Sequence, residues 1–253
     1  MSKALRILSV LVSLFVFALL WVAASEDWGY EGDIGPENWG ELSEDYAVCG
    51  EGQSQSPIDI ADAVQTELAG IEFHYEAAPM AIFNNGHTIE VEYHEGSYII
   101  YNEKQYNVLQ FHFHQPSEHT INGETFPMEM HIVHQNAESG QLAVVGVMLR
   151  EGDVADADYA DIFTNLPVDI SQPDEETETM IDAATLLPED TETFFTYEGS
   201  LTTPPCSQIV RWLVMADPVT LTADQIAIFG EIYDGNARPV QPLNTRDLFT
   251  NAG

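Results

Sequence analysis

The chain has 253 residues, 45% of them hydrophobic, which is enough to bury one full core, and a single domain is the simplest arrangement. Its 42 Asp and Glu residues oppose only 7 Lys and Arg residues, for a formal net charge of −35. Such a chain has almost nothing with which to neutralise phosphates, so the composition excludes nucleic-acid binding. Because like charges destabilise a compact state unless counterions screen them, we expect a halophilic protein from a salty environment.

The N-terminus has the pattern of a signal peptide. Two bases, Lys3 and Arg6, precede an apolar run and a cleavage site of small residues that ends at Ala24. The run is short for a membrane span, so we expect cleavage and no stable membrane insertion afterwards. The less favoured alternative is an uncleaved anchor. We therefore predict a signal peptide over residues 1–24, a mature domain over 25–253, and export to the periplasm or the medium.

Two cysteines, Cys49 and Cys206, both lie in the part that is predicted to be exported. An oxidising compartment favours one disulfide between them, and the alternative is a pair of buried free thiols. Closing so long a loop would stabilise the fold by about 3–5 kcal/mol.

Short β-like segments follow an irregular arm over residues 28–55. In chain order they cover 71–75, 80–83, 88–93, 97–101, 108–114, 128–135 and 141–149. Helical periodicity is weaker and predicts short helices over 157–164, 178–187 and 222–233, the last with Thr222 as its N-cap. We expect a mainly β (α+β) fold, a single domain built on a large, twisted, mostly antiparallel central sheet with short peripheral helices.

Two of these segments carry histidines in a pattern that favours a metal site. His112 and His114 are two residues apart in one segment, so their side chains share a strand face. The turn signal Asn122-Gly123 predicts a return of the chain that brings His131, in the next segment, beside this pair. Three neutral imidazoles with no evident fourth protein ligand describe a catalytic zinc site with an open position. The alternative is a set of hydrogen-bonded core histidines, and for the pair alone the two interpretations are evenly matched.

Nine short motifs follow one another along the chain. They are Trp28-Gly29-Tyr30, Gly35-Pro36-Glu37-Asn38-Trp39, Gln55-Ser56-Pro57-Ile58-Asp59-Ile60, Asn84-Asn85-Gly86-His87-Thr88, Gln110-Phe111-His112-Phe113-His114, Ser117-Glu118-His119, Glu129-Met130-His131, Ser200-Leu201-Thr202-Thr203-Pro204-Pro205-Cys206 and Arg238-Pro239-Val240-Gln241-Pro242-Leu243. Each motif alone is weakly or moderately specific, but in this order they resemble the α-class carbonic anhydrases over essentially the whole mature part. The resemblance implies a central twisted sheet of about ten strands.

The same resemblance implies zinc-dependent, reversible hydration of carbon dioxide to bicarbonate and a proton. A zinc-bound hydroxide attacks CO₂, and carbonic anhydrases are the reference case for a bound water whose pKa is about 7. The implied zinc ligands are His112, His114 and His131, with water or hydroxide as the fourth ligand. Their second ring nitrogens are implied to be held by Gln110 for His112, Glu129 for His131 and the backbone carbonyl of Asn236 for His114.

Other residues acquire roles from the resemblance in the same way. Thr202 accepts a hydrogen bond from the hydroxide and donates one to Glu118, and Thr203 helps to position the substrate. His87 is the implied proton shuttle. Tyr30 and Asn85 are implied to order the intervening water, and Val133, Val144, Leu201, Val210 and Trp212 to form an apolar wall for CO₂.

Glu90 departs from the family pattern, because its position is usually filled by a neutral Asn or Gln on the polar wall of the pocket. We expect a carboxylate there to disfavour the approach of anions and to slow bicarbonate dehydration.

Two other classes of function stay open. An inactive carbonic-anhydrase-like acidic binding domain would typically lack a zinc-binding histidine, and this chain has all three. An acidic matrix protein that binds minerals or cations should have acidic repeats, and the sequence contains none. Exported bacterial relatives are often dimers, so a homodimer is left open, as is the binding of cations to the acidic surface.

Overall fold

The computed structural model describes residues 28–153, 157–173 and 178–252. The signal peptide predicted over residues 1–24 lies outside the described residues. Within the described ranges, no helix combines the length and the apolar character needed to cross a membrane.

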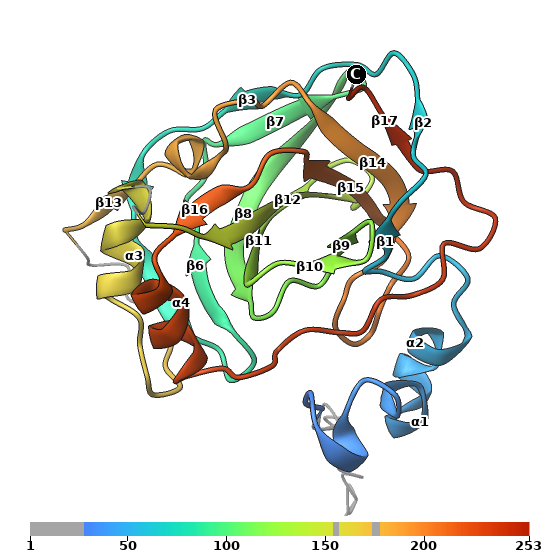
Figure 1. Ribbon diagram of the computed structural model, residues 1–253, viewed down its shortest axis with the longest axis horizontal. Helices are drawn as coiled ribbons and strands as arrows, with labels where there is room; N and C mark the ends of the chain where they lie inside the picture. The colour runs from blue at the N-terminus through green and yellow to red at the C-terminus, as the bar shows by residue number, and fades with distance from the viewer. Residues whose placement is uncertain (1–27, 154–156, 174–177, 253) are drawn as a thin grey trace, which may run out of the picture.

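The body of the molecule is a large twisted β-sheet of twelve strands (Figure 1). Its strands are β2 (Val64–Gln65), β3 (Glu72–His74), β5 (Ala81–Asn84), β6 (Ile89–Glu92), β7 (Tyr98–Tyr101), β8 (Lys104–His114), β11 (Met128–Gln135), β12 (Leu142–Glu151), β14 (Phe194–Gly199), β15 (Val210–Met215), β16 (Val219–Leu221) and β17 (Phe249–Thr250). The order across the sheet is β2-β17-β14-β15-β12-β11-β8-β6-β5, with β16 paired to β12 and β7 joining β8 to β3. The pairs β12·β15, β12·β16 and β17·β2 are parallel, and the other neighbours are antiparallel.

Small elements surround this sheet. Two minor sheets are formed by β1 (Asp59–Ile60), β9 (Thr120–Ile121) and β10 (Glu124–Thr125), and by β4 (Ala78–Pro79) and β13 (Met180–Ile181). The α-helices are α1 (Trp39–Leu42), α2 (Val48–Glu51), α3 (Ala160–Thr164) and α4 (Ala223–Gly230), and the 3-10 helices are η1 (Gly32–Ile34), η2 (Glu44–Tyr46), η3 (Ala157–Tyr159) and η4 (Ala183–Leu186). Figure 1 shows α1 and α2 together at the lower right, and α3 beside α4 at the left.

The predicted fold class is confirmed, with twelve strands in place of about ten. All seven predicted strand segments contain strands, and the segment 128–135 matches β11 residue for residue. Thr222 caps α4, where its hydroxyl accepts a hydrogen bond from the backbone N–H of Gln225. The turn at Asn122-Gly123 is also present, and both residues have positive φ (51° and 78°), as a tight antiparallel hairpin requires.

The helix predicted over residues 178–187 is wrong in its first part, and its second part is a short 3-10 helix. Met180 and Ile181 instead pair with Pro79 and Ala78, so the first part of the segment is the strand β13. The side chain of Asp182 then accepts a hydrogen bond from the backbone N–H of Ala184 and begins the short helix η4. Pairing with a distant strand therefore overrides the weak helical periodicity in the first part of the segment.

The two faces of the sheet enter different apolar clusters, because side chains alternate along each strand. On β11, Met130 and Ile132 join a large cluster that also contains Phe111 and Phe113 of β8. Val133 points to the other face and joins a second cluster. His112 lies between Phe111 and Phe113, and His131 lies between Met130 and Ile132. The alternation therefore places both histidines on the second face.

Candidate functional site

Three histidines converge on the second face of the sheet. His131 of β11 lies directly opposite His112 of β8, and His114 lies two residues further along the same face. One ligand atom from each of the three residues lies within 4.8 Å of the others, and the ring centroids are 4.7–5.3 Å apart. The antiparallel return predicted from the sequence therefore brings the three side chains to one point.

Each imidazole uses one ring nitrogen in a hydrogen bond to the protein. The Nδ1 atom of His112 lies 2.8 Å from Gln110 Oε1, and the Nδ1 atom of His114 lies 2.7 Å from the carbonyl oxygen of Asn236. The Nε2 atom of His131 lies 2.8 Å from Glu129 Oε1. The remaining nitrogens are therefore Nε2 of His112, Nε2 of His114 and Nδ1 of His131.

The three ring nitrogens that make no hydrogen bond to the protein could coordinate a divalent metal ion. Nε2 of His114 is buried and has no hydrogen-bond partner among the described residues, which is costly unless something binds it. Burial, together with the neighbouring histidines, lowers the pKa of His112 well below its ordinary value, and burial also lowers the pKa of His114. Neutral imidazoles are the form that coordinates zinc, so the donor set fits Zn²⁺.

Glu129 is a buried carboxylate that receives four hydrogen bonds. Oε2 accepts the backbone N–H groups of Glu118 and His119 at 2.9 and 2.8 Å, and Oε1 lies 2.8 Å from both His119 Nδ1 and His131 Nε2. Burial opposes ionisation, but His119 and His131 outweigh it and lower the pKa of Glu129 well below its ordinary value. An ionised carboxylate only accepts, so His131 donates from Nε2 and its Nδ1 atom stays free. Although burial lowers the pKa of His131, Glu129 outweighs it and the pKa is raised.

A chain of hydrogen bonds continues from Glu129 through His119 to Tyr197 of β14. The Nε2 atom of His119 lies 2.6 Å from the hydroxyl of Tyr197, which donates to Ser56 Oγ at 2.9 Å. A Cβ atom at Gly146 would lie 3.1 Å from Glu129 Oε1, so the glycine leaves the space that the carboxylate fills. Sequence reasoning assigned no role to Tyr197, Ser56 or Gly146, although Ser56 lies within a motif that it singled out.

Glu118 lies beside the histidine cluster, and a backbone hydrogen bond fixes its carboxylate. Its Oε1 atom accepts the backbone N–H of Arg238 at 2.9 Å. Its Oε2 atom is 3.5 Å from His114 Nε2 and has no hydrogen-bond partner among the described residues. Thr202 is buried. Its hydrogen bond to Glu118 stays a prediction, and Glu118 Oε2 is the atom available to accept it.

Tyr30 also responds to Glu118. Burial raises the pKa of Tyr30 well above its ordinary value, and Glu118 adds to the effect.

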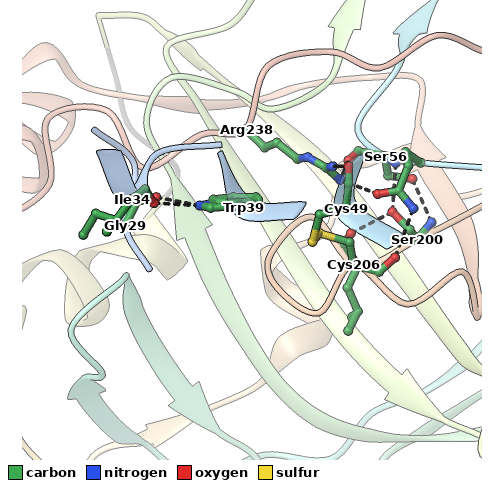
Figure 2. Close-up of a disulfide and its surroundings, with 10 residues drawn as sticks. Gly29, Ile34, Trp39, Cys49, Ser56, Ser200, Cys206 and Arg238 are labelled. Atoms are coloured by element: carbon green, nitrogen blue, oxygen red, sulfur yellow. Dashed lines mark hydrogen bonds between the residues drawn. A yellow bond between two sulfur atoms is a disulfide. The ribbon is translucent and has the colours of Figure 1, made fainter. Parts of the chain in front are cut away.

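The loop that carries Thr202 and Thr203 is tied down by the predicted disulfide, which the structure contains between Cys49 and Cys206. The backbone N–H of Cys206 donates to the carbonyl of Thr203 at 2.8 Å. Figure 2 shows the buried guanidinium of Arg238 beside this disulfide, where it donates to the carbonyl of Cys49 at 2.8 Å.

The residues predicted to form an apolar wall belong to one cluster on the face of the histidines. Val133, Val144, Val210 and Trp212 are buried in it, and Leu201 packs against it. Val144 lies opposite both Val133 and Trp212 in the strand register, so three strands contribute to one surface.

His87 lies on a tightly bonded turn after β5. The Oδ1 atom of Asn85 accepts the backbone N–H groups of His87 and Thr88, both at 2.9 Å. Asn85 Nδ2 donates to Glu90 Oε2 at 2.9 Å. The amide that was predicted to order water is therefore also part of the framework that holds His87. The ring of His87 stacks on Trp28, a contact that sequence reasoning missed.

Known proteins share the sequence and the fold over most of this chain. The family model described as eukaryotic-type carbonic anhydrase matches residues 34–252. A carbonic anhydrase of Nostoc sp. is 43% identical over 229 residues, which are 88% of this chain and 86% of that protein. A carbonic anhydrase of Pectobacterium carotovorum is 39% identical over 240 residues, or 94% and 97% of the two chains. The solved α-carbonic anhydrase of Thermovibrio ammonificans, in complex with the inhibitor sulfanilamide, has a TM-score of 0.85 and 41% identity, covering 89% of this chain and 100% of that one.

Proposed function

The chain belongs to the eukaryotic-type, α-class carbonic anhydrase family, and from this premise we propose that His112, His114 and His131 hold the zinc ion at which it hydrates CO₂. As a carbonic anhydrase it interconverts carbon dioxide and bicarbonate. The observation that carries the proposal is the convergence of three ring nitrogens that the surrounding hydrogen bonds leave free. When bound, zinc supplies a hydroxide nucleophile near neutral pH by lowering the pKa of a water to about 7, an effect for which carbonic anhydrase is the reference case.

The protein's own residues then hold the ligands and the reactants. Gln110, Glu129 and the carbonyl of Asn236 fix the ring orientations of the three histidines, and Glu129 also supplies a buried negative charge close to the metal position. We propose that Thr202 accepts a hydrogen bond from the nucleophilic oxygen and donates one to the free Oε2 of Glu118, which orients that oxygen toward carbon.

We propose that CO₂ contacts an apolar cluster on one side and the loop of Thr202 and Thr203 on the other. CO₂ is apolar, and the cluster of Val133, Val144, Val210, Trp212 and Leu201 offers it an apolar wall from which water is excluded. Thr203 lies next to Thr202 on the same loop and is proposed to position the substrate.

Each hydration cycle releases a proton that must leave the pocket. We propose that His87 carries it to the solvent, with Tyr30 and Asn85 ordering the water between.

An inactive binding domain is the less favoured alternative. Such a domain has no need for three converging imidazoles, each with one ring nitrogen hydrogen-bonded to the protein. Nor does it need a buried His114 Nε2 atom that has no hydrogen-bond partner among the described residues.

The compartment to which the protein is exported and the salt content of its environment are also proposals. The apolar start of the chain supports a signal peptide over residues 1–24, ahead of one domain over 25–253, and the disulfide fits an oxidising compartment such as the periplasm or the medium. The net charge of −35 supports a salty environment and surface cations. A homodimer remains a proposal that sedimentation velocity at several protein concentrations would test.

Metal analysis with CO₂ hydration tests the zinc proposal. We expect one zinc per wild-type chain, and loss of zinc and activity together in His114→Ala. His74→Ala is a matched control, because His74 lies on β3 with a side chain 42% exposed, away from the cluster. It should keep both zinc and activity. Stoichiometric zinc in His114→Ala, or an active wild-type enzyme without zinc, would contradict the proposal.

A further inference from the structure

Glu90 places a carboxyl group next to the histidine cluster. It lies on β6 directly opposite His112 of β8. Residues paired in this way point to the same face of the sheet and have Cβ atoms about 5 Å apart. Glu90 is half-buried, so its carboxylate is only partly screened by water.

The carboxylate is held in place by the turn that precedes it. Glu90 Oε2 accepts a hydrogen bond of 2.9 Å from Asn85 Nδ2, and the other end of the Asn85 amide is bonded to the backbone of His87 and Thr88. With both ends occupied, Asn85 cannot turn away without breaking three hydrogen bonds. Glu90 is therefore held in a fixed position on the strand beside His112.

The carboxylate of Glu90 has no basic side chain paired with it in the part of the chain that the structure describes. The next residue of β6 on the same face is Glu92, opposite Gln110, and it adds a second negative charge. A ligand that approaches the cluster along this strand meets uncompensated negative charge.

Resting on the proposed zinc site, we infer that Glu90 is a specificity-determining residue, whose fixed negative charge weakens the binding of small anions at the histidine cluster and leaves uncharged CO₂ unaffected. The reason is that Coulomb repulsion acts on the anion and has no first-order effect on a neutral molecule. Weaker anion binding would be useful in the proposed salty environment, because chloride is then the most abundant anion that could occupy the site in place of the substrate. At molar salt the Debye length is about 3 Å, but a half-buried charge adjacent to the ligand is screened less than that figure suggests.

Removing the charge while keeping the hydrogen bond tests the inference. Glu90→Gln retains an amide oxygen that can accept from Asn85. Glu72→Gln is the matched control, because Glu72 is an exposed glutamate on another strand, β3. The readout is the Kd of thiocyanate for the zinc-loaded protein, measured by calorimetry at pH 7.5 and constant ionic strength. Chloride inhibition of CO₂ hydration provides a second measurement.

We expect the thiocyanate Kd to fall about 5- to 30-fold in Glu90→Gln and less than twofold in Glu72→Gln. The KM for CO₂ should change less than twofold in both. A zinc-loaded, active Glu90→Gln enzyme with an unchanged thiocyanate Kd overturns the inference and leaves the proposed function intact. Wild-type protein that binds no zinc overturns the proposed function, and this inference with it.

A purely structural role for Glu90 gives a different pattern. Glu90→Ala removes the acceptor of Asn85 as well as the charge. If Glu90 only holds the turn, the alanine variant lowers the Tm while the glutamine variant keeps the wild-type thiocyanate Kd, and that result also overturns the inference. Equal tightening of thiocyanate binding in both variants supports the role of charge.

Discussion

The imidazole ring of His87 stacks on the indole ring of Trp28, with centroids 3.8 Å apart and planes 7° from parallel. Trp28 in turn makes edge contacts with Tyr30 at 5.6 Å and Trp39 at 5.3 Å. A ring held by such a cluster has few orientations available to it. The N-terminal arm therefore sets the position of the proposed proton carrier.

Replacing the proton carrier should slow turnover in a specific way. In His87→Ala we expect kcat to fall about tenfold or more in dilute buffer, while kcat/KM for CO₂ stays within twofold, because proton release follows the chemical step. Added imidazole should restore kcat. Trp28→Ala keeps the imidazole but frees the ring, so its kcat should fall by less. Stopped-flow hydration measures these values, and an unchanged kcat in His87→Ala would exclude the shuttle role.

Glu129→Gln should weaken zinc binding about 10- to 100-fold, the usual range for a group that supports a metal ligand. The NH2 group of the amide replaces one carboxylate oxygen and so faces two of the four donors around Glu129, and the amide cannot supply the buried negative charge. Competition with a chromophoric chelator measures the affinity, with Glu124→Gln on exposed β10 as the control. Unchanged zinc affinity in Glu129→Gln would show that its hydrogen bonds do not support the metal.

His134 should make stability depend on pH. Burial lowers its pKa from 6.5 to about 4 in the fold, where its ring lies 2.8 Å from the hydroxyl of Tyr75 and 3.1 Å from the carbonyl of Ala143. Between these values the unfolded chain binds a proton that the folded chain does not, so stability falls as pH drops from 6.5 toward 4. The full loss is about 3 kcal/mol, at 1.36 kcal/mol per pKa unit.

The difference between wild type and His134→Gln isolates this contribution. Urea unfolding at several values between pH 7.5 and 4.5 should give a shallower acid loss in the variant, which has no titrating group there. Parallel pH profiles for the two proteins would contradict the assignment.

The disulfide between Cys49 and Cys206 joins residues 157 positions apart. Replacing both cysteines with serine should lower the free energy of unfolding by about 3–5 kcal/mol, because the unfolded chain regains loop entropy. Urea unfolding measures the change, and reduction of the wild-type protein with dithiothreitol should reproduce it. A variant as stable as the oxidised protein would contradict this expectation.

The net charge of −35 predicts a response to salt. We expect the Tm to rise from low to molar NaCl, because counterions screen the repulsion between surface acids. Thermal melts followed by circular dichroism measure this. A Tm that stays flat or falls as salt increases would reject the proposed salty environment.

Features that follow from local rules could be predicted before the fold was known. Strand alternation puts His112 and His114 on one face, and the Asn122-Gly123 turn brings back the strand of His131. The predicted export and a cysteine count of two favoured the pairing of Cys49 with Cys206, because the chain contains no other cysteine.

The groups that surround these residues depend on how distant parts of the chain pack together. The hydrogen bonds from His119 to Tyr197 and from Tyr197 to Ser56, and the stacking of Trp28 on His87, join segments far apart in the chain. The same holds for Met180 and Ile181, where pairing with β4 replaced the first part of the predicted helix. Periodicity reports which face a side chain occupies, whereas the partner that it meets there depends on the packing of the whole sheet.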